Sequence, residues 1–432
     1  MGCSRVPAFR KARTGLCLAN DKVRGGLGRE SPWFREVRNG TPRAAPSTMT
    51  TASSRRPDEA FAARLDRART SGSALLDLTD SDPARWGLGW DHAELEGLLE
   101  ESRATGGQPE LVRSRAREAV ASYLAGRSVL VPPEHIQLTA SIGMAQRLLV
   151  ELLCRPGDEV LVASPSRAVV ELPVATESVR VVTYALVYDG TWRIDRRSLE
   201  KAVTGRTRAI LVGNPSQPTG AALSREDLAF VEDLCSQRGI AIVADEAFMD
   251  TLDGGASVIE VTRCAGFHLS GLSGVCGLLA LGAEWVAGAG PDELVAPVLA
   301  RLELAIEASG AAPGPALAAV PALLARRERF LAELRTRLSR NRALLASAAL
   351  GESSWTVERG AGGCWAVLRI GGAEDEESLC LRLLEDGVAV LPGFTQGLPR
   401  HGYLVVSRLP TPEVFLEALS LLDRRLRAPL FE

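Results

Sequence analysis

Lysine is almost absent from this chain. Lys11, Lys22 and Lys201 are its only lysines, although Lys+Arg number 50 among 432 residues, so arginine carries nearly all of the positive charge. No lysine follows residue 201. A reaction that needs an imine with a lysine amine therefore has no candidate nucleophile in more than half of the chain.

Other absences narrow the class of protein. No apolar run approaches the roughly 18 residues that mark a membrane span. The near balance of 50 Lys+Arg against 53 Asp+Glu lacks the basic excess of a nucleic-acid-binding domain. The 8 cysteines show no paired spacing of a disulfide framework or a zinc site. We expect reduced thiols, a cytoplasmic location, and neither a metal, a membrane nor a nucleic acid as partner.

Two nucleotide-binding motifs are also missing. The chain has no Gly-rich string ending in Gly-Lys-Ser or Gly-Lys-Thr, and no G-x-G-x-x-G that follows a strand. These absences argue against a P-loop nucleotidase and against a dinucleotide-binding enzyme.

The first 48 residues differ from the rest of the chain. They are rich in arginine, poor in acidic residues and without apolar periodicity. Such a leader can be a transit peptide, but Met49 would also begin a plausible chain if the start codon were assigned too early. We predict that 1–55 is a disordered or wrongly assigned extension.

From residue 110 onward, apolar strands alternate with amphipathic helices. This alternation predicts an α/β fold with a doubly wound, mainly parallel sheet covered on both faces by helices. Functional groups in such sheets gather at the carboxyl ends of strands, where Asn214 and Asp245 are both expected. The predicted strands are 135–139, 159–163, 179–185, 209–213 and 240–244, and the predicted helices are 110–124, 142–154 and 225–238.

Near Pro313 the pattern changes to that of a compact α+β unit. A long helix is predicted over 316–350, with its start marked by Pro321. The predicted elements that follow are strands at 355–359 and 362–370, a helix at 376–386, strands at 388–392 and 403–407, and a helix from Pro412.

The order of several motifs resembles the class I/II aminotransferases of fold type I, which depend on pyridoxal 5′-phosphate (PLP), and the histidinol-phosphate aminotransferase-like branch among them. The motifs that carry the resemblance are Pro156-Gly157-Asp158-Glu159-Val160, Asn214-Pro215-Ser216-Gln217-Pro218-Thr219-Gly220, Ala244-Asp245-Glu246-Ala247-Phe248, Gly271-Leu272-Ser273-Gly274 and Val390-Leu391-Pro392-Gly393. The resemblance implies an N-terminal segment of a small domain over 56–94, a large domain over 95–312 and the rest of the small domain over 313–432.

The resemblance also implies a cofactor site. Asp245 matches the carboxylate that faces the pyridine nitrogen of PLP, although a strand-end aspartate that caps a loop would look the same. Gln217 replaces an asparagine that contacts the ring hydroxyl, and Phe248 replaces a tyrosine. Ser141 belongs to the helix start that offers N–H groups to the phosphate. With Asn214, these residues form the candidate cofactor-binding set.

The sequence departs from the family at the reactive positions. His268 stands three residues before Gly271, where the Schiff-base lysine is expected, and an imidazole cannot form that bond. Cys276 stands at the position of the phosphate-binding arginine. The remaining departures are Ala265 and Phe267 for phosphate-binding hydroxyl residues, Arg167 for the stacking aromatic, and Val405 for the carboxylate-binding arginine, with Arg408 as a substitute only if its strand ends early.

His268 and Cys276 each have two interpretations. His268 is either a general base opposite Asp245 or a buried histidine that fills the volume of the lysine. Cys276 is either a nucleophile, which requires a basic partner, or an inert buried thiol.

Two classes of function stay open at this point. The chain is either a non-catalytic paralogue, acting as a ligand-binding protein or as a partner subunit of an active homologue, or a PLP-dependent aminotransferase-like enzyme of amino-acid or secondary metabolism with an atypical site. The departures predict weak or absent, non-covalent PLP binding. The family implies a dimer, either a homodimer or a heterodimer with an active homologue.

Overall fold

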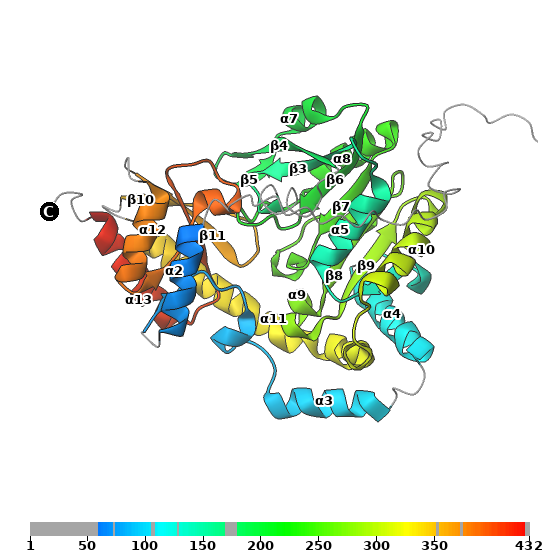
Figure 1. The fold of residues 1–432 in the computed structure, drawn as a ribbon, viewed down its shortest axis with the longest axis horizontal. Helices are drawn as coiled ribbons and strands as arrows, with labels where there is room; N and C mark the ends of the chain where they lie inside the picture. Colours follow the sequence, from blue (N-terminus) through cyan, green and yellow to red (C-terminus); the bar gives the residue numbers. More distant parts are fainter. Residues whose placement is uncertain are drawn as a thin grey trace, which may run out of the picture.

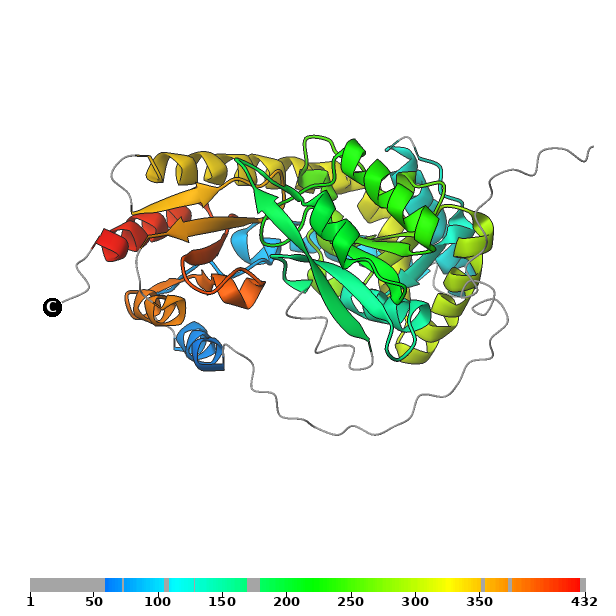
Figure 2. The same ribbon diagram turned by 90° about the horizontal axis from the view of Figure 1, so that it is seen from above.

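A computed structural model describes residues 59–71, 74–104, 109–127, 129–168, 179–350, 354–371 and 375–427. Figures 1 and 2 show two layers of helices around a central sheet, with a smaller group of strands and helices beside it. The predicted N-terminal extension, 1–55, lies outside the described residues.

Eight strands of the described chain form the central sheet, in the order β2-β9-β8-β7-β6-β3-β4-β5. Strands β8, β7, β6, β3 and β4 run parallel, while β9 and β5 run antiparallel to their neighbours. This confirms the predicted mainly parallel α/β sheet. The bounds are β2 Ile136–Thr139, β3 Glu159–Ser164, β4 Arg180–Tyr188, β5 Trp192–Ile194, β6 Thr207–Gly213, β7 Ala241–Asp245, β8 Gly266–Gly271 and β9 Glu284–Ala289.

Each face of this sheet packs into its own apolar core. Helices α5 (Ile142–Leu153) and α10 (Asp292–Ser309) cover one face, and α4 (Pro109–Ala125), α8 (Arg225–Arg238) and α11 (Gly314–Ala348) cover the other. Helix α8 has the predicted bounds. The Ser224 hydroxyl accepts from the backbone N–H of Asp227 at its start, and Gly239 ends it in the left-handed conformation.

The smaller group surrounds a second sheet, in the order β10-β11-β14-β13. Helix α2 packs beside α12, and the short strand β1 pairs with β12, so residues near the described N-terminus join this group. The bounds are α2 Glu59–Thr70, β1 Leu76–Asp77, β10 Trp355–Glu358, β11 Trp365–Ile370, α12 Glu376–Glu385, β12 Val388–Ala389, β13 Leu391–Pro392, β14 Tyr403–Ser407 and α13 Pro412–Arg427.

Two predicted elements need correction. The predicted strand 388–392 is divided between β12, which pairs with β1, and β13, which pairs with β14. The apolar run looks continuous because both halves are buried, but each half pairs with a different partner. Pro321 lies inside α11 instead of at its start. Its missing N–H removes one helical hydrogen bond, and packing of α11 against both groups of elements maintains the helix there.

A seam of glycines joins the two groups. Gly220 follows β6, and its backbone oxygen accepts from the N–H of Ala361 at 2.8 Å. An ideal Cβ at Gly220 would lie 2.6 Å from the oxygen of Gly362, and one at Gly360 would lie 2.3 Å from the oxygen of Thr219. Because the backbones touch, neither position has room for a side chain.

Helix α11 runs along both groups, and α3 (His92–Ala104) packs on it. The predicted division at 312–313 stays a prediction, as does the unit over 56–94. None of the helices in the described residues is long and apolar enough to cross a membrane.

Candidate functional site

A cavity of about 250 Å³ lies at the carboxyl ends of β3, β6 and β7. Its walls come from the start of α5, the Asn214–Gly220 motif and the loop before β11. The polar residues that line it are Gln146, Arg147, Ser166, Arg167, Ser216, Gln217 and Asp245, and aromatic walls come from Phe248 and Trp365.

The structure brings three of the predicted site residues together in this cavity: Gln217, Asp245 and Phe248. The Asp245 side chain is exposed, and its carboxylate accepts from the N–H of Ala247 at 3.2 Å. Asp245 therefore caps the following turn and also faces the cavity. Ser141 lies nearby as the N-cap of α5, where its hydroxyl accepts from the N–H of Met144 at 3.3 Å.

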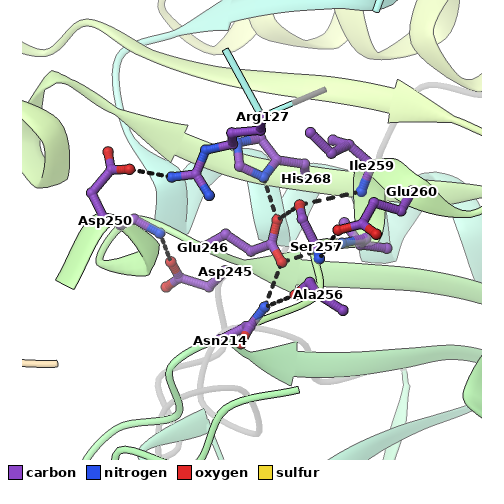
Figure 3. Close-up of polar contacts among 12 residues, drawn as sticks. Arg127, Asn214, Asp245, Glu246, Asp250, Ala256, Ser257, Ile259, Glu260 and His268 are labelled. Carbon is purple, nitrogen blue, oxygen red and sulfur yellow. Dashed lines mark hydrogen bonds and ion pairs between the residues drawn. The ribbon is translucent and has the colours of Figure 1, made fainter. Parts of the chain in front are cut away.

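Asn214 and His268 belong to a different cluster, which is buried (Figure 3). Its centre is Glu246, a residue that the sequence analysis did not select. The Glu246 carboxylate pairs with Nδ1 of His268 at 2.5 Å, and accepts from Nδ2 of Asn214 at 2.7 Å and from the hydroxyl of Ser257. Burial raises the pKa of Glu246, but these hydrogen bonds outweigh it and hold the pKa below its usual value.

His268 and Asp245 lie on opposite faces of the sheet. His268 is beside Ala244 in the register of β8 and β7, whereas Leu269 is beside Asp245. Because side chains alternate along a strand, His268 faces away from Asp245 and toward Glu246. This geometry contradicts the interpretation of His268 as a base opposite Asp245. It agrees with the other interpretation, in which His268 is a buried histidine held by a hydrogen bond.

Cys276 is buried beyond the end of α9 (Leu272–Val275), where its thiol donates to the backbone oxygen of Leu323 at 3.7 Å. Burial raises the pKa of Cys276 to about 12. The thiol is therefore protonated near neutral pH and is no activated nucleophile. Ala265 and Phe267 are likewise buried in the apolar core.

The region of the expected carboxylate-binding arginine is also buried. Val405 lies inside β14, which ends at Ser407, so Arg408 follows the strand directly. The Arg408 guanidinium donates to the backbone oxygen of Gly363 at 2.5 Å. Burial lowers the pKa of Arg408 to about 10. This arginine holds the loop at the cavity wall in place.

One further carboxyl group is close to Asp245. Glu284 opens β9 and is 3% exposed, and its carboxylate accepts from the hydroxyl of Ser273 at 2.8 Å and from the Ser273 N–H at 3.3 Å. Burial is the main cause that raises the pKa of Glu284 to about 8, and the charge of Asp245 raises it further. Glu284 was not predicted from the sequence, where its only signal is a glutamate at the start of an apolar run.

Comparison with known proteins agrees with this architecture. The family model described as aminotransferase class I and II matches residues 90–417. A probable N-succinyldiaminopimelate aminotransferase of Mycobacterium tuberculosis is 30% identical over 284 residues, which cover 60% of this chain and 66% of that protein. Tyrosine aminotransferase of Bos taurus is 27% identical over 156 residues, 36% of this chain, so the match spans only 35% of that relative.

The fold itself is found among solved structures. An alanine aminotransferase from Pyrococcus furiosus superposes with a TM-score of 0.76 at 20% identity, covering 85% of this chain and 95% of that one. At that identity the likeness shows the fold alone. The match of the family model is the wider evidence, since it includes both the central sheet and most of the second group of elements. The chain belongs to the class I and II aminotransferase family.

Proposed function

We propose that this chain is a non-catalytic member of its family, which binds a small molecule in the cavity at Asp245 and forms no covalent bond with PLP. One observation carries the proposal: none of the described residues lining the cavity has a primary amine. Lys201 is exposed on α7 (Arg196–Ala202) and is not part of the cavity wall. Lys11 and Lys22 precede the described residues.

The residues present do not fit covalently bound PLP. The cofactor needs a lysine amine, donors for its phosphate and a carboxylate for its ring nitrogen. Among the described residues of the cavity wall, Asp245 can supply the carboxylate and Arg147 and Arg167 can donate to an anion, but none supplies the amine. Cys276, Ala265 and Phe267, at the phosphate positions implied by the resemblance, are buried in the core. A hydrogen bond to a charged group contributes about 1.5–3 kcal/mol. Losing several such bonds weakens PLP by roughly two to four orders of magnitude.

The first test is a spectral titration of PLP followed by borohydride reduction, which makes any imine permanent. We expect no imine absorption and no PLP-modified lysine in peptides of the wild-type protein. His268→Lys should give the same result, because a lysine there would face Glu246, away from Asp245. A Lys11→Arg/Lys22→Arg variant is the control that shows whether a PLP-modified lysine comes from either of these two residues.

Tight binding of PLP to the wild-type protein, or turnover of an amino donor, would favour the alternative of an aminotransferase with an atypical site. An imine in His268→Lys would show that the side chain at 268 reaches the cavity, contrary to the geometry above.

We further propose that the chain acts in the cytoplasm as a dimer, either with itself or with a lysine-containing homologue. Support comes only from its family membership. If the chain pairs with itself, sedimentation of the purified protein should give twice the monomer mass of 46.0 kDa. Co-purification with an active homologue from the native cell would support the partner-subunit role. A monomer with no co-purifying homologue would contradict both the homodimer and the heterodimer.

A further inference from the structure

Two carboxyl groups lie on the same face of the central sheet, next to the cavity. Asp245 ends β7, Glu284 begins β9, and β8 lies between them. In register, Leu269 of β8 is beside both Asp245 and Val286, and Gly271 is beside Glu284. Since side chains two residues apart share a face, Glu284 and Asp245 are on the same face, at diagonal positions.

Gly271 allows the two groups to approach. An ideal Cβ at this position would lie 1.4 Å from Oε2 of Glu284, so the carboxyl group occupies the space that a side chain would take. Ser273 holds it there through its hydroxyl and its N–H. The Glu284 carboxyl thus lies over β8, close enough to Asp245 for the two charges to interact.

On the side of this pair that faces the cavity, three groups can accept hydrogen bonds from a ligand group that carries several N–H donors. Asp245 supplies a carboxylate, and Gln217 supplies an amide oxygen. The hydroxyl of Ser216, whose residue is 5% exposed, lines the same cavity and has no hydrogen-bond partner in the described chain. An ammonium group has three N–H donors and no acceptor, which suits this set.

We propose that the cavity binds a primary alkyl amine through Asp245, and that Glu284 is the positioning residue which increases the attraction when it carries a charge. This inference rests on the proposed function, because it assigns non-covalent binding to the same cavity. Phe248 and Trp365 provide aromatic walls for the alkyl chain and for contact with the cation. Arg147 and Arg167 are exposed in the cavity wall, so a carboxylate at the far end of the amine suits the probe.

The pH dependence of binding distinguishes this arrangement from a single aspartate. Among described residues, the titratable groups that interact with Glu284 are Asp245 on β7 and the Cys276 thiol after α9. Ser273 and Thr139 of β2 are its polar neighbours without a charge. Because the pKa of Glu284 is about 8, a second negative charge develops beside Asp245 between pH 7 and 9. An alkyl ammonium with a pKa near 10.4 remains charged over that range.

The experiment is a titration of PLP-free, full-length protein with 6-aminohexanoate, followed through the fluorescence of Trp365 in the cavity wall, with a Trp365→Phe variant to assign the signal. We expect hexanoate, which lacks the amine, to bind at least tenfold more weakly, and Asp245→Asn to lose at least tenfold in affinity. The wild type should bind the amine several-fold more tightly at pH 9 than at pH 7.

Glu284→Gln should bind at pH 7 like the wild type and show no tightening toward pH 9. Glu293→Gln, an exposed carboxylate of α10, is the matched control and should keep the wild-type profile. Circular dichroism of each variant establishes that it is folded, and Glu284→Gln keeps the hydrogen-bonding shape of the side chain.

The proposal is overturned if hexanoate binds as tightly as 6-aminohexanoate, if Asp245→Asn binds like the wild type, or if Glu284→Gln tightens with pH as the wild type does. These outcomes are separate from those of the PLP test. A reducible lysine adduct would refute the non-catalytic function without affecting the amine titration, and a failed titration would leave the absence of an imine in place.

Discussion

Replacing Glu246 with leucine should lower the free energy of unfolding by about 3–5 kcal/mol, as expected when a buried carboxylate that accepts several hydrogen bonds is removed. The carboxylate receives hydrogen bonds from Asn214 and Ser257, pairs with His268, and also accepts from the N–H of Val258 at 3.2 Å. Leucine accepts none of these. Each buried donor left without a partner costs about 1–3 kcal/mol.

Chemical denaturation of the wild type and the variant measures this change. Removing both members of the pair, in Glu246→Leu/His268→Leu, should cost less than the sum of the two single changes, because no buried imidazole is then left unpaired. Glu200→Gln, at an exposed position of α7, should change the unfolding free energy by no more than about 0.5 kcal/mol. A loss below about 1 kcal/mol for Glu246→Leu would mean that the cluster is hydrated or open.

The second large effect is a pH dependence of stability that comes from Glu284. In the unfolded chain this carboxyl loses its proton near its ordinary pKa of 4.5, whereas in the folded chain it keeps the proton up to a pKa of about 8. Between these values the native state binds more protons than the unfolded state, so the unfolding free energy falls as pH rises. At about 1.4 kcal/mol for each pKa unit, the contribution is roughly 3–5 kcal/mol.

Glu284→Gln should therefore be more stable than the wild type at pH 8, and the gap should close toward pH 5. The measurement is the unfolding free energy of both proteins at several pH values, because their difference cancels the other titrating groups. Glu293→Gln should follow the wild type throughout. A difference between Glu284→Gln and wild type that stays constant with pH would indicate that the Glu284 carboxyl titrates normally in the folded state.

Much of the fold could be predicted because several strands of the central sheet, such as β7, are almost wholly apolar, and because some helices carry caps. Helix α8 is an example, since Ser224 and Gly239 at its two ends are visible in the sequence. The division between β12 and β13 could not be predicted. It depends on which distant strand each pair of residues meets, and a run of five residues contains no information about that.

The candidate site was predictable only in part. Asp245, Gln217 and Phe248 follow from motif order, because the ends of neighbouring parallel strands meet at one edge. The direction of His268 does not follow, since a shift of one residue in a strand reverses the face of every side chain. Glu246 and Glu284 were missed because their significance comes from burial and from partners that are distant in the sequence, such as Ser257 and Ser273.

The glycine seam has a consequence for how this chain can diverge from its relatives. Gly220 and Gly360 join the two groups of elements through backbone atoms, so the contact does not depend on the identity of any side chain. Residues in the cavity can be exchanged without disturbing that contact, whereas any substitution at the two glycines forces the backbones apart. The placement of the two groups is therefore less sensitive to exchange of side chains in the cavity than to a change at these two positions, where even a methyl group would require the backbones to separate.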